Sequence, residues 1–225
     1  MIKKATWKKI PLKGIRKAIA QNMLASVSQA PQVTVTEDVN ISKLYKLRKK
    51  EKLALEKKGI KLTYLPFIIK ASIATIKELP IFNSSIQGEE IIIKKYYNIG
   101  IATETPAGLM VPVVKDADNK TMSQIAKQIQ PLYIRAKKRE LSLEELKGST
   151  FTITNYGSIG GIYATPIINP GESAILGIGR IFDREGRKIL PLSLTFDHRV
   201  IDGAQASRFI EKVKTYLEDP DHLLI

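Results

Sequence analysis

The chain has 225 residues, of which 44% are hydrophobic, and a formal net charge of +14 at pH 7. This length and composition suit one large domain with a substantial core. There is no cysteine and there are only two histidines, which excludes disulfides, a cysteine nucleophile and a multi-histidine metal site. No stretch reaches the roughly 18 apolar residues of a membrane span, and no apolar signal core follows the basic start. We therefore expect a cytoplasmic protein.

The positive charge is spread along the chain rather than gathered in one patch. Lysines alternate with glutamate, as in Lys49-Lys50-Glu51-Lys52, and this pattern is typical of solvated helix faces. A nucleic-acid binder would cluster its basic residues among aromatic ones. We therefore expect neither nucleic acid nor a membrane as a partner. A basic scaffold or nucleic-acid binder without catalysis is the alternative from another class, and salt-dependent binding to a random duplex would identify it.

The first part of the chain predicts a short arm, three helices and a strand. Residues 1–13 form the arm, the helices lie at residues 15–27, 42–58 and 63–79, and the strand lies at 32–39. Pro31 and Pro80 end the first and third helices, and Gly59 ends the second.

The second part predicts a mixture of strands and helices. Strands are expected at residues 90–94, 97–103, 109–114 and 151–154, and a hairpin at 173–182 and 188–196. A helix at 122–136 contains Pro131, which should kink it or loosen one turn. Ser142 and Glu145 form a capping box for a short helix, and a last helix carries Phe209 to Leu217. Because these elements do not repeat as βαβ units, we predict an α/β two-layer sandwich with a mixed β-sheet.

His198 lies where the strand at 188–196 passes into the turn before the last helix. Catalytic side chains are often held in this way between rigid elements. The other histidine, His222, is in the terminal tail, so His198 is the candidate for a proton acceptor at neutral pH. On spacing alone, a histidine here is more often structural, and Asp202 is first of all an N-cap.

The run Asp197-His198-Arg199-Val200-Ile201-Asp202-Gly203-Ala204 resembles the active-site signature of the acyltransferase component of 2-oxo acid dehydrogenase complexes. Further matching motifs lie at residues 15–20, 98–102, 108–113, 150–157 and 217–220. The resemblance implies a chloramphenicol-acetyltransferase-like fold, with an N-terminal arm at 1–13 and an acyltransferase catalytic domain at 14–225. The lipoyl and peripheral-subunit-binding domains of the family are absent from this sequence.

The resemblance also implies roles for individual residues. His198 would take the proton from the thiol of coenzyme A, or of dihydrolipoamide in reverse, and Asp202 would support the geometry of the site, through a basic residue such as Arg16. Thr154 stands where many family members carry a serine that faces the oxyanion; its alternative role is that of a strand-forming threonine. For coenzyme A, the resemblance points to Arg48, Thr63, Glu104, Tyr133, Asn155, Ser158, Gly179 and Ile181. No metal site is implied.

We therefore expect an acyltransferase that moves an acyl group between dihydrolipoamide and coenzyme A, as the assembling core of such a complex. The lipoyl group would be carried on a domain not present in this chain. The run from residue 154 to 161 looks closer to the branched-chain members than to the pyruvate ones. The alternative is a free-standing chloramphenicol-type O-acetyltransferase, and a comparison of dihydrolipoamide with chloramphenicol as acyl acceptor separates the two.

The resemblance implies trimers in which each active site lies between two subunits, with His198 from one and Thr154 from its neighbour. The apolar ending Leu223, Leu224 and Ile225 would dock into an adjoining trimer and join trimers into a cage; alternatively, it folds back onto its own domain. Further partners would be the lipoyl domain and, through segments absent here, the decarboxylase and dihydrolipoamide dehydrogenase components.

Overall fold

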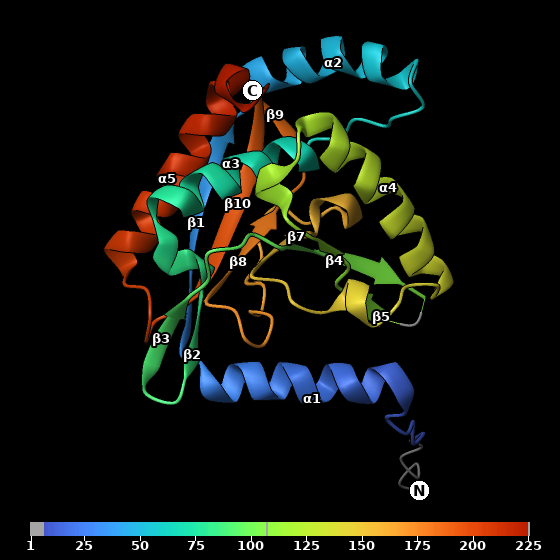
Figure 1. Ribbon diagram of the computed structural model, residues 1–225, viewed down its shortest axis with the longest axis vertical. Helices are drawn as coiled ribbons and strands as arrows, with labels where there is room; N and C mark the ends of the chain where they lie inside the picture. Colours follow the sequence, from blue (N-terminus) through green and yellow to red (C-terminus); the bar gives the residue numbers. More distant parts are fainter. Residues whose placement is uncertain (1–6, 107, 225) are drawn as a thin grey trace, which may run out of the picture.

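The computed structural model describes residues 7–106 and 108–224, and its centre is a mixed eight-stranded sheet (Figure 1). The strands along the sheet are β1 (Gln32–Asn40), β10 (Arg187–Asp197), β8 (Ala174–Ile178), β7 (Phe151–Asn155), β4 (Ile99–Thr105) and β5 (Gly108–Met110), while β6 (Val113–Val114) pairs with β4 and β9 (Phe182–Arg184) with β10. β4, β7 and β8 are parallel to one another, and every other pair in this sheet is antiparallel.

Three helices form the second layer against one face of this sheet. They are α3 (Leu65–Glu78), α4 (Met122–Lys138) and α5 (Gly203–Glu218). In the view of Figure 1, α2 (Ser42–Glu56) lies above the sheet, and α1 (Gly14–Gln29) runs apart from the other helices below it. The predicted α/β two-layer sandwich with a mixed sheet is confirmed.

The two faces of the sheet differ in chemistry because side chains alternate along a strand. On β10, Leu192, Leu194 and Phe196 face the helical layer and belong to the main core, whereas Ser193 and Thr195 point to the other face. Ser193 and Thr195 are nevertheless buried, at 0% and 2% exposure. The segment from residue 156 to 173 supplies polar contacts to that face, so β10 is covered on both sides.

A cluster of three phenylalanines connects the helical layer to the sheet. The ring of Phe209 on α5 stacks on Phe82 with centroids 4.1 Å apart, and lies 5.8 Å from the ring of Phe151 on β7. Phe82 comes from the short 3₁₀ helix η1 (Pro80–Asn83), which follows α3. All three side chains are fully buried. The cluster therefore joins α5, η1 and β7 into one core.

Several element boundaries differ from those predicted. The expected strand at 173–182 is divided into β8 and β9, and the one at 109–114 into β5 and β6, where Pro112 has no N–H to donate to a ladder. The hairpin partner of β3 (Glu90–Ile93), namely β2 (Ser84–Gln87), was not predicted. α4 continues as one helix through Pro131. The short helix after Ser142 is the 3₁₀ helix η3 (Glu144–Leu146), with the expected reciprocal contacts between Ser142 and Glu145.

The C-terminal residues correct one expectation. The 3₁₀ helix η5 (Pro220–Leu224) brings Leu223 into the main core of its own chain, where it is only 3% exposed. Leu223 is therefore not free to dock on an adjoining trimer, because its side chain already packs within its own domain. The side chain of Leu224 and the whole of Ile225 lie outside the described residues.

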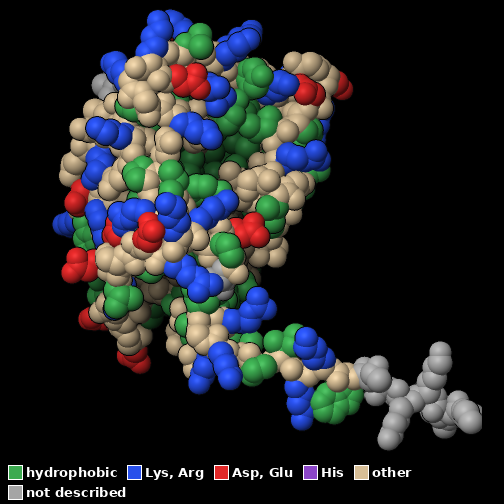
Figure 2. Space-filling model, turned by 90° about the vertical axis from the view of Figure 1, so that its right-hand side faces the viewer, with side chains coloured by type: hydrophobic (Ala, Val, Ile, Leu, Met, Phe, Trp, Pro, Cys, Tyr) green, Lys and Arg blue, Asp and Glu red, His purple; other side chains and the backbone are tan. Residues whose placement is uncertain are grey.

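The face shown in Figure 2 carries its charges in the dispersed way that the sequence predicts. Lys and Arg side chains are scattered over it with Asp and Glu between them, and hydrophobic side chains line a hollow in its upper half. Among the described residues, exposed ion pairs such as Lys52 with Glu56 and Lys212 with Glu78 offset some of the positive charge. Within residues 7–106 and 108–224, no helix combines the length and the apolar character needed to cross a bilayer.

We predict that Phe209→Ala lowers the free energy of unfolding by about 3–5 kcal/mol, because it empties the centre of the aromatic cluster. Chemical denaturation measures this loss. Phe182→Ala on β9 is the control, since its ring is only half-buried and lies outside the main core. Equal losses for the two variants would show that the cluster is not the centre of the core.

Candidate active site

His198 is presented to solvent by a backbone that is held at several points. β10 ends at Asp197, and the N–H groups of Val200 and Ile201 both donate to the carbonyl of Asp197 at 3.0 Å. The N–H of His198 donates to the carbonyl of Pro31 at 2.9 Å. Its imidazole is exposed and lies 5.7 Å from the ring of Phe196. The turn therefore fixes the backbone of His198 and leaves its side chain free to meet another molecule.

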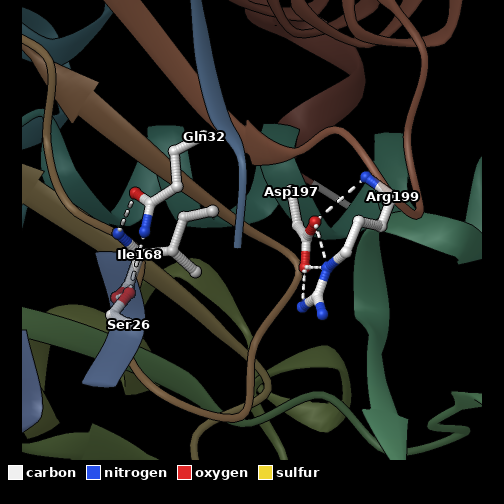
Figure 3. Close-up of polar contacts among 5 residues, drawn as sticks. All are labelled: Ser26, Gln32, Ile168, Asp197 and Arg199. Atoms are coloured by element: carbon white, nitrogen blue, oxygen red, sulfur yellow. Dashed lines mark hydrogen bonds and ion pairs between the residues drawn. The ribbon is translucent and has the colours of Figure 1, made fainter. Parts of the chain in front are cut away.

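Asp197 and Arg199, which flank His198 in the sequence, form an ion pair with each other (Figure 3). The Asp197 carboxylate, 5% exposed, accepts from the guanidinium at 2.7 Å through Nη2 and at 3.0 Å through Nε, and also from the backbone N–H of Arg199 at 3.0 Å. These hydrogen bonds raise the pKa of Arg199. A bidentate pair of this kind is strong and directional. It closes the turn that carries His198.

A second set of hydrogen bonds steadies Pro31, the partner of His198 (Figure 3). Ser26, near the end of α1, donates to the Ile168 carbonyl at 2.6 Å and accepts from Gln32 at 2.9 Å. The N–H of Ile168 donates to the Gln32 side chain at 3.0 Å. The end of α1, the start of β1 and a distant loop are thus fastened together on either side of Pro31.

Asp202 is the N-cap of α5, as its position in the sequence predicts. Its carboxylate accepts from the N–H of Gln205 at 2.7 Å, and the Gln205 side chain accepts in return from the N–H of Asp202 at 2.9 Å. The residues that the structure describes give Asp202 no cationic partner, so the expected link to Arg16 is not formed within one chain. Asp202 thereby fixes the helix that follows the His198 turn.

Thr154 lies on β7, on the face opposite the helical layer. Phe151 and Ile153 of the same strand point into the core, so the alternation of the strand directs Thr154 away from it. The side chain of Thr154 is half-buried, and its neighbours in register are Ala102 on β4 and Gly177 on β8. Thr154 is next to last in its strand, at the carboxyl ends of three parallel strands.

Thr154 and His198 of one chain are far apart. Thr154 is in register with Gly177 on β8, which is in register with Ser193 on β10. His198 follows five residues later along β10, a displacement of about 16 Å along the strand direction in addition to two strand spacings of about 4.8 Å each. The two side chains therefore cannot meet the same reacting atom within one chain.

Most of the residues expected to bind coenzyme A gather at the edge that carries Thr154. Asn155 is the last residue of β7, Gly179 follows the carboxyl end of β8 with Ile181 just beyond, and Glu104 is exposed near the end of β4. Asn155 accepts from the N–H of Ser158 at 3.2 Å, which orients the start of the 3₁₀ helix η4 (Gly157–Ile159). The parallel direction of the three strands brings these positions together.

The need for a glycine at position 179 is explained by contacts within the chain itself. A Cβ at this position would lie 2.1 Å from the carbonyl oxygen of Ile162, and a Cβ at Gly157 would lie 2.3 Å from the backbone of Gly179. The structure shows that the chain's own loop makes this close approach, which leaves the role of Gly179 toward coenzyme A as a prediction.

Arg48 and Thr63 lie close together, whereas Tyr133 lies elsewhere. Arg48 donates to the Leu62 carbonyl at 3.1 Å, and its guanidinium lies 4.8 Å from the ring centroid of Tyr64. α2, which carries Arg48, begins beside the start of β10, and that is the edge at which β8 ends. Tyr133 lies on α4 and is 46% exposed, with the Lys137 ammonium 4.7 Å from the centroid of its ring; no described contact joins it to the other candidates.

A buried polar cluster around Glu172 was not predicted from the sequence. Its carboxylate accepts from Thr152 and Asn169 at 2.9 Å each and from Ser149. Burial raises the pKa of Glu172, and burial also lowers that of nearby Lys94. In the sequence, residues 169–173 have the composition of an ordinary polar turn. Their position directly before a buried strand was the only sequence feature that could have indicated a buried Glu172.

The fold by itself places the chain in a structural class. The structure is similar to chloramphenicol acetyltransferase with a TM-score of 0.58 over 88% of this chain and 94% of the other, at 18% identity, which shows the shared fold. Residues 4–225 match the 2-oxoacid dehydrogenases acyltransferase (catalytic domain) family, and the chain belongs to that family.

Closer relatives agree with this assignment. The dihydrolipoyllysine-residue acetyltransferase component of the pyruvate dehydrogenase complex from Bacillus subtilis is 46% identical over 224 residues, which cover 95% of this chain and 51% of the relative. The chain thus spans about half the length of that protein. The Azotobacter vinelandii dihydrolipoamide acetyltransferase superposes with a TM-score of 0.94 at 39% identity, covering 100% of this chain and 96% of the other. The cubic core of a pyruvate dehydrogenase multienzyme complex gives a TM-score of 0.94 at 38% identity, covering 100% and 96%.

We predict that Arg199→Ala lowers the free energy of unfolding by about 1–3 kcal/mol, because it leaves the buried Asp197 carboxylate without its strongest donor. Arg199→Lys should lose less, since it keeps the charge but not the planar fork. Chemical denaturation compares them with Arg208→Ala, an exposed arginine on α5. A loss in Arg199→Ala no larger than in Arg208→Ala would contradict this account of the turn.

Proposed function

We propose that the chain is the catalytic core of a dihydrolipoamide acetyltransferase, which moves an acetyl group between dihydrolipoamide and coenzyme A. The observation that carries the proposal is the separation of His198 and Thr154 at opposite ends of one sheet. In a chain of this family, the separation is explained when His198 of one copy faces Thr154 of another. We propose an acetyl group rather than a branched acyl group because the relatives are components of pyruvate dehydrogenase complexes. The resemblance of residues 154–161 to the branched-chain type finds no support among these relatives.

The proposed chemistry follows from the two side chains. The imidazole of His198 accepts the proton of one thiol, and the resulting thiolate attacks the carbonyl carbon of the acyl thioester. The hydroxyl of Thr154 donates a hydrogen bond to the oxyanion of the tetrahedral intermediate. The intermediate then expels the second thiolate, which recovers the proton from His198. A general base of this kind supplies about 10²–10⁴ in rate, and one oxyanion donor about 10²–10³.

Coenzyme A would lie along the edge of the sheet that carries Thr154. Arg48 would meet a phosphate as a charged donor, with Thr63 beside it. The pantetheine arm would pass Asn155, Ser158, Gly179 and Ile181, and Glu104 would lie near the end of β4. Tyr133 joins this set only if the substrate reaches the exposed face of α4. The lipoyl group would arrive on a separate domain, from the side of His198.

The related solved structures support a multimeric core, since one of them is the cubic core of a pyruvate dehydrogenase complex. We propose that residues 14–225 form the catalytic domain after the arm at residues 1–13, of which residues 1–6 lie outside the described part. Partners would be a lipoyl domain and the decarboxylase and dihydrolipoamide dehydrogenase components. The chloramphenicol-type alternative is not favoured, because the likeness to chloramphenicol acetyltransferase rests on the fold alone.

A hybrid-trimer experiment tests whether the site is shared between chains. His198→Ala and Thr154→Val should each be nearly inactive when assembled alone, because each lacks one half of every site. The two variants are then unfolded together and refolded at equal concentrations. A site is intact when the Thr154→Val chain supplies His198 and the His198→Ala chain supplies Thr154, which is expected for roughly a quarter of all sites in a closed ring. Transfer from acetyl-coenzyme A to dihydrolipoamide measures the recovery.

The controls separate chemistry from packing. Thr154→Ser keeps the hydroxyl and should be nearly as active as the wild type. Each single variant refolded alone provides the baseline. If the mixture stays at that baseline although both variants assemble, the site does not form between copies. If His198→Ala retains most of its activity, His198 is not the base.

The tail prediction is revised to exclude Leu223. We predict that deletion of residues 224 and 225 releases smaller oligomers from a large particle, because the proposed docking residues are lost. These oligomers should stay active, because the remaining chain still buries Leu223 in its own core. Leu223→Ala should instead lower the free energy of unfolding by about 2–5 kcal/mol. Sedimentation and denaturation measure the two effects, and a truncated protein that stays in the large particle would contradict the docking role of the tail.

A further inference from the structure

A row of small side chains crosses the sheet next to Thr154. Thr154 is in register with Ala102 on one side and with Gly177 on the other, and Gly177 is in register with Ser193. Paired residues on adjacent strands point to the same face of a sheet and lie about 4.8 Å apart. Gly177 therefore leaves open the position beside Thr154 that a larger residue would fill with its own side chain.

The ring of Tyr156 occupies this position. A Cβ on Gly177 would lie 2.6 Å from Cε1 of Tyr156 and 3.3 Å from its hydroxyl. On the opposite edge of the ring, a Cβ on Gly161 would lie 3.0 Å from Cδ2. The two glycines thus form a slot for the aromatic ring, and a side chain at residue 177 would displace it.

The hydroxyl of Tyr156 fixes the ring in this slot. It lies 2.8 Å from Oγ of Ser193, a residue with 0% exposure, and the N–H of Ala164 reaches the same Oγ at 3.5 Å. Burial raises the pKa of the Tyr156 phenol, so the group stays neutral and keeps its hydrogen bond at physiological pH. The backbone also holds the residue, because its carbonyl accepts from the N–H groups of Ile159 and Gly161.

We infer that Tyr156 is a specificity-determining residue whose ring closes the acyl pocket on the Gly177 side of Thr154 and restricts transfer to small acyl groups. This inference rests on the proposed function, which places the acyl carbonyl at the Thr154 hydroxyl. The substituent on that carbonyl must then lie within a few ångströms of Thr154, where a fixed aromatic wall limits its size. An acetyl group fits beside such a wall, and a branched acyl group meets it.

The expected size of the effect follows from general pocket energetics. One methyl or methylene group that does or does not fit an apolar pocket changes kcat/KM by roughly 10- to 200-fold. Isobutyryl exceeds acetyl by two methyl groups. Removal of the ring should therefore change the ratio of the two rates at least roughly tenfold, whereas loss of the hydroxyl alone should leave the wall in place.

The test compares acetyl-, propionyl- and isobutyryl-coenzyme A as donors to dihydrolipoamide in the assembled protein. Tyr156→Ala should raise the isobutyryl-to-acetyl ratio of kcat/KM at least roughly tenfold, with propionyl in between. Tyr156→Phe keeps the ring and should leave the ratio unchanged. Tyr163→Ala is the matched control, because this tyrosine lies in the same segment but is 49% exposed and bonds to Asp38; its ratio should also match the wild type.

A merely structural role gives a different result. If Tyr156→Ala lowers the rates for all three donors by the same factor, the ring does not select the acyl group and the inference is overturned. If that variant does not fold, Tyr156→Leu, which keeps a smaller apolar side chain, replaces it and should still raise the ratio; an unchanged ratio overturns the inference. A wild-type protein that transfers none of the three groups overturns the proposed function itself, whereas an active one with a preference independent of residue 156 overturns only this assignment.

Discussion

The direction of β10 relative to β7 and β8 is the constraint on which the rest of the structure depends. β7 and β8 run parallel, so Thr154, Asn155 and the segment after Ile178 meet at one edge of the sheet. β10 runs antiparallel to β8, so the turn that follows it emerges at the opposite edge. A residue after β10 and a residue at the end of β7 can therefore never meet within one sheet of this topology. The proposed chemistry requires a second copy of the chain for this geometric reason.

Each half of the proposed site is rigid within its own chain. His198 follows a strand that is buried on both faces, and its turn is closed by the ion pair of Asp197 with Arg199 and by the bond to Pro31. Thr154 lies inside a continuous sheet, flanked by strands on both sides. Catalysis depends on reacting groups that are already placed, since small displacements cost large factors in rate. Association has only to bring two ordered surfaces together.

The sequence predicted the layers, the mixed sheet and the position of His198, because these depend on local signals. Alternating apolar residues in 188–196 predicted β10, and Asp202 as an N-cap marked the start of α5. The misplaced boundaries depend on pairing between strands: β5 and β6 pair with β4 on either side of Pro112, which has no N–H for the ladder, and β2 exists because it pairs with β3. Tyr156 and Gly177 are 21 positions apart in the sequence, and only the folded sheet brings the ring over the glycine. The same is true of Glu172, whose donors come from β7 and from the segments on either side of it.

The polar face of the sheet explains why the loop from residue 156 to 173 matters as much as the helical layer. Helices bury apolar rows, but this face carries Thr152, Thr154, Ser193 and Thr195, which must keep hydrogen bonds when they are covered. The loop meets that demand with the Tyr156 hydroxyl and the Glu172 carboxylate. Apolar packing against the helices leaves no room for substrate, whereas a polar face covered by a loop can leave one row open at its edge. Thr154 is half-buried on this face near the carboxyl end of β7, so the same loop that completes the fold also determines how much space remains beside it.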